Sequence, residues 1–299
     1  MDLLQLSYFK KVTECQSMTA AARDLMITTS SLCASIRRLE QDLGYRLFDR
    51  VGRNNQLNEN GKLVLEHTCS ILNSVEMMHR ELERRNSGKE ELYIGTTNRT
   101  YWVKAINRFA VQHPSASISV SFLNCSDLLN PYLYVHYDVI FSGASDFNQP
   151  DWEKETLIEN DTPMLLAYAE HPATEKASVD LREVAAEPFI AFDKKDPSRL
   201  FFDDLFAKAD LVPNVVINCD QFLRAPLIAS GYGLGVTTRY GSKTDLLSNL
   251  VAIPISYPPY IREQAMFHYK KKTSSTIESE FREFMLDYMK ISLNAASLP

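Results

Sequence analysis

The chain has 299 residues, enough for about two domains, and its 45% hydrophobic and 23% charged residues are typical of a globular protein with a sizeable core. No apolar run approaches the ~18 residues of a membrane helix, and the start lacks the basic and apolar blocks of a signal peptide. The formal net charge of −6 argues against a protein that coats nucleic acid by charge alone.

The distribution of charge and the cysteine content further restrict the possible partners and the cellular compartment. Residues 1–62 carry nine Lys or Arg and seven Asp or Glu, a charge of +2, which leaves −8 on the rest and permits a local basic face near the N-terminus. The five cysteines are odd in number, dispersed and never in C-x-x-C spacing. Reduced thiols are the simplest interpretation, so we expect a cytoplasmic protein.

Three helices are predicted at the start of the chain. Residues 3–14 place apolar residues on one helical face. Residues 17–25 contain alanines that let another helix approach, and residues 28–43 form the next helix, capped by Thr28 and ended by Gly44. Two helices joined by about three residues predict a helix-turn-helix.

The next segment predicts a wing and then a long helix. Leu47, Phe48 and Leu57 flank a polar, glycine-containing tip, which is typical of a two-stranded ribbon. From Asn58 to about Arg85 the chain is again helical. A heptad stripe predicts a dimer seam, with packing on its own chain as the alternative, and it consists of Val64, Ile71, Val75, Met78 and Leu82.

Strands and helices alternate after a linker at residues 86–89. Helices are expected at 101–112 and 126–134. The alternation favours an α/β domain with a largely parallel sheet. The predicted strands are residues 91–96, 117–123, 137–143, 162–169, 187–192, 213–219 and 234–238.

Motifs of enzymes are absent from the sequence. It contains no H-E-x-x-H, G-x-S-x-G or Walker A pattern, and its six histidines lack metal-ligand neighbours at useful spacing. The run from Gly231 to Gly235 lacks the third glycine of a nucleotide loop, so a helix end and tight turn is the better interpretation. We expect no catalysis, metal or cofactor.

The helix at 28–43 has the properties of a DNA-reading helix. Its apolar stripe is expected to face the core, which leaves hydroxyls, an alanine and arginines on the other side. Hydroxyls and arginines contact bases and phosphates, although capping and a solvated face are the alternatives. The candidates are Thr29, Ser30, Ser31, Cys33, Ala34, Arg37 and Arg38, with Arg50 and Arg53 in the wing.

These motifs resemble those of the LysR-type transcriptional regulators. The pattern S-M-T-A-A-A-x-x-L, followed by I-R-R-L-E-x-x-L-G-x-x-L-F-x-R, covers the family's N-terminal signature, and PFIAF near residue 190 and ASGYGLGV near residue 235 extend a looser similarity. The resemblance implies a winged helix-turn-helix at 1–58, a dimerising linker helix at 59–88 and an effector domain at 89–299. It also implies double-stranded DNA, a small effector, a homodimer or homotetramer and RNA polymerase as partners.

By the same resemblance, the effector domain has two lobes like those of periplasmic binding proteins. Lobe I comprises residues 90–162 and 266–299, and lobe II residues 163–265. Three arginines offer a charge partner for an anionic effector, or are surface residues. The implied cleft residues are Thr96, Thr97, Asn98, Arg99, Thr100, Asn124, Ser126, Ser142, Gly143, Phe192, Asp193, Arg199, Gln221, Thr237 and Thr238, with Arg224 as the third arginine.

The DNA-reading helix departs from the family pattern. Thr29 and Ser30 stand where the family usually has Gln and Pro, and Cys33 and Ala34 where it usually has Ser and Arg. The operator is therefore not predictable from relatives. Two further hypotheses remain: a receptor with a drifted DNA-binding head that acts through a protein partner, and an enzyme that uses the cleft.

Overall fold

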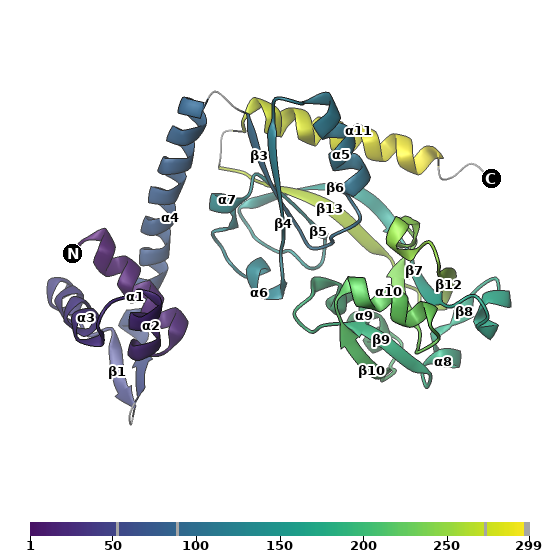
Figure 1. Cartoon of the computed structure of the whole chain (residues 1–299), viewed down its shortest axis with the longest axis horizontal. Helices are drawn as coiled ribbons and strands as arrows, with labels where there is room; N and C mark the ends of the chain where they lie inside the picture. The colour runs from purple at the N-terminus through teal and green to yellow at the C-terminus, as the bar shows by residue number, and fades with distance from the viewer. Residues whose placement is uncertain (52–53, 88–89, 272–273, 296–299) are drawn as a thin grey trace. The chain divides into compact units, whose positions relative to one another are not determined.

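The computed structural model describes residues 1–51, 54–87, 90–271 and 274–295. The chain forms two compact units, Met1–Gly88 and Lys89–Pro299, each of which is described by itself (Figure 1). Within the described ranges, no helix is both long enough and apolar enough to cross a membrane.

The first unit, which we call the head, contains three short helices, a two-stranded ribbon and one long helix. Its antiparallel ribbon pairs Phe48 with Leu57, so the two strand ends meet at the base of the wing. The elements are α1 (Leu3–Cys15), α2 (Met18–Asp24), α3 (Thr29–Leu43), β1 (Phe48–Val51), β2 (Asn54–Leu57) and α4 (Glu59–Ser87).

Side-chain caps fix where these helices begin. The hydroxyl of Thr28 accepts from the Ser31 N–H at 3.1 Å, and the side chain of Asn58 accepts from the Gly61 N–H at 2.9 Å. Gly44 ends α3 in the left-handed conformation, with φ of 78°. The buried stripe of α3 packs against α1 and α2 in one core that contains Leu6, Phe9, Val12, Ala21, Ala22, Leu32, Ile36, Leu39 and Leu47.

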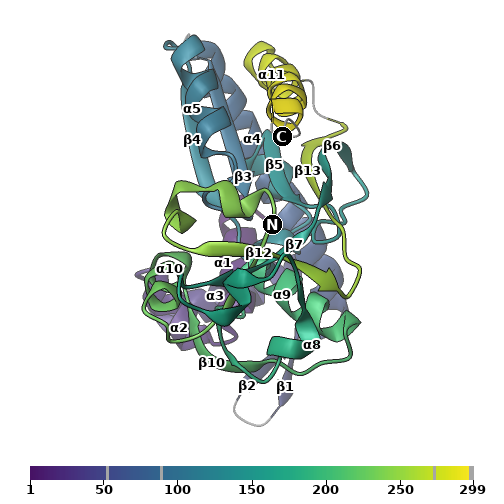
Figure 2. The same ribbon diagram turned by 90° about the vertical axis from the view of Figure 1, so that its right-hand side faces the viewer.

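The second unit has two lobes. Lobe I is built on a five-stranded sheet in the order β4-β3-β5-β13-β6. Helices α5 and α11 cover one face of it (Figure 2). Helices α6 and α7 cover the other face. The elements are β3 (Glu91–Thr96), α5 (Val103–Gln112), β4 (Ser117–Phe122), α6 (Cys125–Leu128), α7 (Leu133–His136), β5 (Val139–Gly143), β6 (Trp152–Asp161), β13 (Arg262–Tyr269) and α11 (Thr276–Ala295).

Lobe II is a second α/β layer. Its sheet runs β11-β7-β12-β8, and the pair β10-β9 joins it through a bridge between Phe189 and Leu234. Helix α9 packs on one side and α10 on the other. The elements are β7 (Pro163–Ala167), η1 (Pro172–Glu175), β8 (Val179–Asp180), α8 (Leu181–Val184), β9 (Pro188–Phe192), α9 (Pro197–Lys208), β10 (Asn214–Cys219), α10 (Gln221–Ala229), β11 (Gly235–Thr238), η2 (Gly241–Lys243), η3 (Asp245–Leu247) and β12 (Val251–Tyr257).

Two predictions about this unit are wrong. The sheet of lobe I is mixed rather than largely parallel, because β13 pairs antiparallel with β5 and with β6. These strands lie where the chain crosses between the lobes, at residues 161–163 and again at 257–262. The helix expected at 126–134 is two short helices, α6 and α7, separated around Asn130 and Pro131 because proline removes a backbone donor.

Candidate functional site

The N-terminal part of α3 is an exposed polar surface. Thr29, Ser30, Ala34, Arg37 and Arg38 are exposed, and Cys33 is partly exposed. The first turn of a helix also carries unpaired backbone N–H groups and a partial positive charge. This surface therefore offers hydroxyls, a methyl group, backbone donors and guanidinium groups along one helix.

Two of the candidate hydroxyls are engaged by the helix cap. The Thr28 hydroxyl lies 2.7 Å from that of Ser31 and 3.0 Å from that of Ser30. Thr29 makes no such contact and projects from the same turn. The wing candidates are not placed: Arg53 and the side chain of Arg50 lie outside the described residues.

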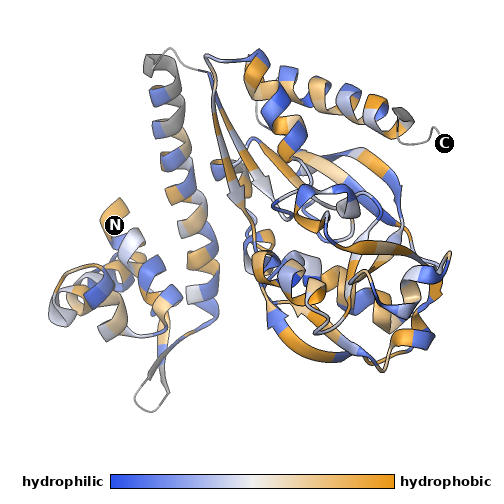
Figure 3. Ribbon diagram, turned by 45° about the vertical axis from the view of Figure 1, so that its right-hand side comes forward, coloured by the Kyte–Doolittle hydropathy of each residue, from blue (hydrophilic) through white to orange (hydrophobic). Residues whose placement is uncertain are grey.

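The heptad stripe of α4 divides between two environments. Val64, with Leu65 and Leu72, packs against the core of the head. Ile71, Met78 and Leu82 are 39%, 51% and 48% exposed, although they are apolar. Apolar and polar residues alternate along this helix (Figure 3). One face of α4, as far as Leu72, thus belongs to the head, whereas Ile71, Met78 and Leu82 form an exposed apolar seam.

A cavity of about 60 Å³ lies between the two lobes. Lobe I contributes the loop after β3 and the start of β13. Lobe II contributes the ends of β9 and β11, the helices α9 and α10, and the segment after β11. The lining residues are Thr97, Asn98, Thr100, Tyr101, Phe192, Ser198, Phe201, Gln221, Arg224, Ala225, Val236, Thr237, Thr238, Gly241, Thr244, Leu246, Leu247, Arg262 and Gln264.

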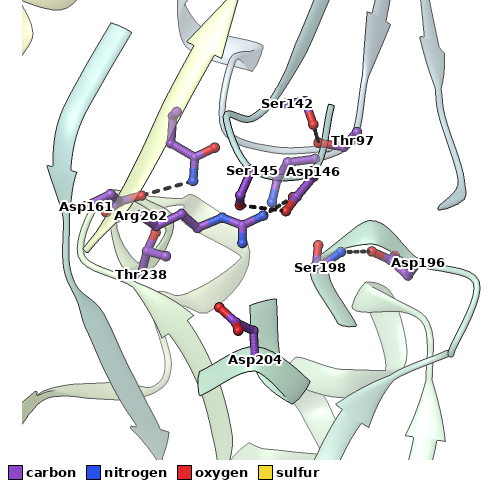
Figure 4. A network of polar contacts seen from close by, with 12 residues as sticks. Thr97, Ser142, Ser145, Asp146, Asp161, Asp196, Ser198, Asp204, Thr238 and Arg262 are labelled. Carbon is purple, nitrogen blue, oxygen red and sulfur yellow. Dashed lines mark hydrogen bonds and ion pairs between the residues drawn. The ribbon is translucent and has the colours of Figure 1, made fainter. Parts of the chain in front are cut away.

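Among the described residues, two charged side chains line this cavity. Arg262 forms a buried ion pair with Asp146 (Figure 4). Arg224 is 3% exposed and donates to two backbone oxygens, to Ile190 at 3.0 Å and to Val236 at 2.6 Å. Burial lowers the pKa of Arg224 from its ordinary value to about 10, because the cation has lost water.

A chain of polar contacts connects the lobes beside the cavity. The Tyr101 hydroxyl of lobe I lies 2.6 Å from the hydroxyl of Thr238 in lobe II. Asp161, at the end of β6, accepts from the Tyr240 N–H at 2.8 Å and from the Gln264 amide at 3.3 Å. Burial raises the pKa of the Asp161 carboxyl, against the opposing hydrogen bonds from Thr238 and Tyr240.

Seven of the residues implied by the family resemblance line the cavity together. They are Thr97, Asn98, Thr100, Phe192, Gln221, Thr237 and Thr238. Arg224, named as an optional charge partner, joins them. They meet because strand ends and helix beginnings of both lobes face the same space.

The other implied residues lie outside the cavity wall. Thr96, Ser142 and Gly143 are buried, and Asn124 caps α6. Ser126 and Asp193 are exposed, and Arg99 stacks over the ring of Phe122 at 3.8 Å. Arg199 is buried but pairs with Asp203 at 2.7 Å and donates to Asn218 at 2.6 Å.

Sequence reasoning missed several lining residues. Tyr101 lines the cavity, whereas its neighbour Trp102 packs within lobe I by stacking on Phe141. Arg262 and Gln264 lie on β13, a strand that the periodicity did not indicate. The segment REQAMFHY has no regular alternation of polar and apolar residues, so the sequence carries no clear signal for them.

Comparison with known proteins identifies the chain. The family model described as LysR substrate binding domain matches residues 85–290, and that of the bacterial regulatory helix-turn-helix protein, lysR family, matches residues 3–62. The chain belongs to the LysR family of transcriptional regulators. The predicted fold, a winged helix-turn-helix, a long helix and a two-lobed effector domain, is thereby confirmed.

The relatives of this LysR-family regulator match nearly its whole length. The uncharacterized HTH-type transcriptional regulator YybE of Bacillus subtilis (strain 168) is 26% identical over 96% of this chain and 99% of its own. The crystal structure of full-length BenM has a TM-score of 0.57 at 21% identity, over 98% of each chain. The crystal structure of full-length CbnR in complex with its target DNA has a TM-score of 0.60 at 19% identity, and the match covers 95% of this chain and 99% of the CbnR chain.

Proposed function

We propose that this ligand-responsive LysR-family regulator reads DNA with the N-terminal part of α3 and binds its effector in the cavity between the lobes. The exposed polar surface of α3 carries the first part of the proposal. Residues near the N-terminus of the second helix of a helix-turn-helix contact base edges in the major groove. Thr29, Cys33 and Ala34 occupy those positions and are accessible.

The remaining roles follow from this assignment. The apolar seam of Ile71, Met78 and Leu82 supports a homodimer, which would present two copies of α3 to a pseudo-palindromic site. A regulator of this type works in the cytoplasm, contacts RNA polymerase and needs no catalytic step. In this proposal the cavity binds and releases its ligand without transforming it.

Gel-shift titrations on the DNA that flanks the regulator's own gene test the proposal. Thr29→Ala should change the preferred sequence, because a base contact is lost. Arg53→Ala should weaken binding about equally on all sequences and lower the salt slope by about one, because a phosphate contact is lost. The expectation for Arg53 rests on its place in the sequence.

A matched control lies on the same helix. Gln41→Ala changes an exposed side chain of α3 at the end far from Thr29, so it should leave site preference unchanged. If no salt-sensitive specific binding is found, the chain is instead a receptor whose head has lost DNA reading. Equal losses on all sequences for Thr29→Ala and Arg53→Ala would contradict the division into base and phosphate contacts.

A further inference from the structure

Arg224 is a buried cation without a counter-ion among the described residues. Its Nε and Nη2 donate to the carbonyl oxygens of Ile190 and Val236, which fix the guanidinium plane against the ring of Phe192, 4.4 Å from the centroid. Its Nη1 makes no hydrogen bond within the described part of the chain, although Arg224 lines the cavity. Burying an unpaired charge is costly, so this arrangement favours an incoming anion.

The rest of the cavity wall adds no further charge. Arg262 is neutralised by its ion pair with Asp146, and none of the described lining residues is an Asp or Glu. Arg224 is therefore the charged lining side chain without an ion pair, while the carboxylate of Asp196, which does not line the cavity, interacts with it only at longer range. A ligand with one negative group is matched by Arg224, whereas a second negative group would be buried without a partner.

The uncharged part of the wall offers hydrogen bonds in addition to apolar contacts. The Asn98 Oδ1 accepts from the backbone of Thr100 and Tyr101, which leaves its amide nitrogen as a donor toward the cavity. The side-chain amide of Gln221 also lines the cavity and forms no hydrogen bond in the described part of the chain. These groups suit a hydroxyl or keto oxygen on the ligand.

The small volume of the cavity favours a small ligand. About 60 Å³ is room for roughly four to six water-sized groups. A carboxylate and two or three further heavy atoms fit this space. Phosphate has nearly the same size, but at neutral pH it is a mixture of the mono- and dianion, and it lacks an apolar part for Phe192 and Val236.

We propose that the effector is a small monocarboxylic acid with a hydroxyl or keto group, and that its carboxylate pairs with Arg224. This inference rests on the proposed role of the cavity as the effector site. The arginine fork supplies a charge-assisted hydrogen bond from Nη1, and the amides of Asn98 and Gln221 bind the second oxygen. Arg224 thus determines that the ligand is an acid.

Calorimetric titration of the full-length regulator tests this with defined probes. Lactate and pyruvate should bind saturably, whereas lactamide, the neutral analogue, should bind at least about 30-fold more weakly because Arg224 gains no partner. Malate should be at least about 10-fold weaker than lactate, because its second carboxylate has no cation. Inorganic phosphate should be weaker than both monoacids.

Two variants assign the effect to Arg224. Arg224→Met keeps the volume but removes the charge, and should weaken lactate binding by about 30-fold or more. Arg199→Met removes another buried arginine of lobe II, one that is paired with Asp203 and absent from the cavity wall, and should bind lactate within about threefold of the wild type. Circular dichroism verifies that both variants fold.

The contrary outcomes are distinct. Equal binding of lactate and lactamide, tighter binding of phosphate or malate, or no binding of any acid would each overturn the proposal, even if Arg224→Met did not fold. Wild-type binding by a folded Arg224→Met variant would do the same. Gel shifts on the same preparations distinguish failure of this inference from failure of the proposed function. Specific DNA binding without acid binding would contradict the inference about the effector but not the proposed DNA-binding function.

Discussion

Asp161 is a buried carboxyl at a crossing between the lobes. It is 1% exposed at the end of β6, where the Tyr240 N–H and the Gln264 amide donate to it. Burial raises its pKa from the ordinary value of 3.8, so the folded state holds this proton more strongly than the unfolded chain does. Its contribution to stability is therefore present at low pH and is lost as pH rises through the raised value.

Asp161→Asn should stabilise the protein at neutral pH. The substitution removes the buried charge, and the side-chain amide of Gln264 can turn to form a hydrogen bond with the new amide at position 161. We expect the free energy of unfolding to exceed that of the wild type at pH 7 and the difference to shrink as pH falls toward 3.8. Urea unfolding across this pH range measures both.

Asp180 provides a control with the opposite sign. Its carboxyl pairs with the exposed Arg182, which lowers the pKa of Asp180. Its contribution to the free energy of unfolding is therefore present above the ordinary pKa of 3.8 and is lost as the pH falls through the lowered value. Asp180→Asn keeps a helix cap but should not stabilise the protein at neutral pH. An Asp161→Asn variant that is less stable than the wild type at pH 7 would contradict the assignment.

At the residue scale, the sequence predicted strand-end residues of the site but not the environment of each arginine. Thr97 and Thr238 follow or end strands, and strand ends meet in folds of this kind. Arg199 and Arg224 both lie early in helices of lobe II. Their difference depends on Asp203, which lies one turn beyond Arg199, and on the absence of an acid one turn beyond Arg224, where Ile228 stands.

At the scale of elements, α4 joins two kinds of packing in one helix. Its first turns complete the core of the head through Val64, whereas Ile71, Met78 and Leu82 form the apolar seam. Burial of a half-exposed seam by a second copy removes apolar surface from water at about 25 cal/mol per Å². The seam therefore favours association without being needed for the fold of the head.

The double variant Met78→Glu, Leu82→Glu should weaken self-association without unfolding the head. Two carboxylates in the seam lose water or repel their copies in a dimer, while in the single chain these positions are about half exposed. Sedimentation equilibrium should show a dissociation constant raised by about tenfold or more. Val64→Glu should instead lower the melting temperature, since Val64 packs against the head core.

Elements also differ in how well the sequence predicted them. α3 and α4 have strong periodicity and caps, and β3 is a short apolar run; their predicted ranges agree with the observed ones within a few residues. β6 and β13 were not predicted, because both carry many polar residues and neither has a clear alternation of polar and apolar residues. Pairing between strands distant in the chain decides such elements.

At the scale of the whole effector unit, several contacts hold the two lobes together around the cavity. The Tyr101 and Thr238 hydroxyls meet on one side, and the Cys125 N–H of lobe I donates to the Lys195 carbonyl of lobe II at 2.9 Å. Both bonds must break when the lobes separate. The observed arrangement of the lobes around the cavity is thus stabilised by the protein's own hydrogen bonds.

Tyr101→Phe should make opening more frequent. Loss of one hydrogen bond worth about 1 kcal/mol raises the population of the open form about fivefold. Amide hydrogen exchange at Cys125 should accelerate by a similar factor, because its bond to Lys195 breaks on opening. As a control, Tyr232→Phe changes an exposed tyrosine of the same unit and should leave the exchange rate of Cys125 unchanged. An unchanged rate in Tyr101→Phe would contradict the role of the Tyr101 hydroxyl in holding the lobes together.

The two crossings between the lobes, at residues 161–163 and 257–262, limit how the effector unit can move. A body tied at one point can swivel in every direction, whereas a body tied at two points turns only about the line that joins them. The binding free energy of a ligand between the lobes is then directed into one angle instead of being spread over three rotations. Each effector would then fix one angle between the lobes, and chemically different ligands could be compared by that single angle.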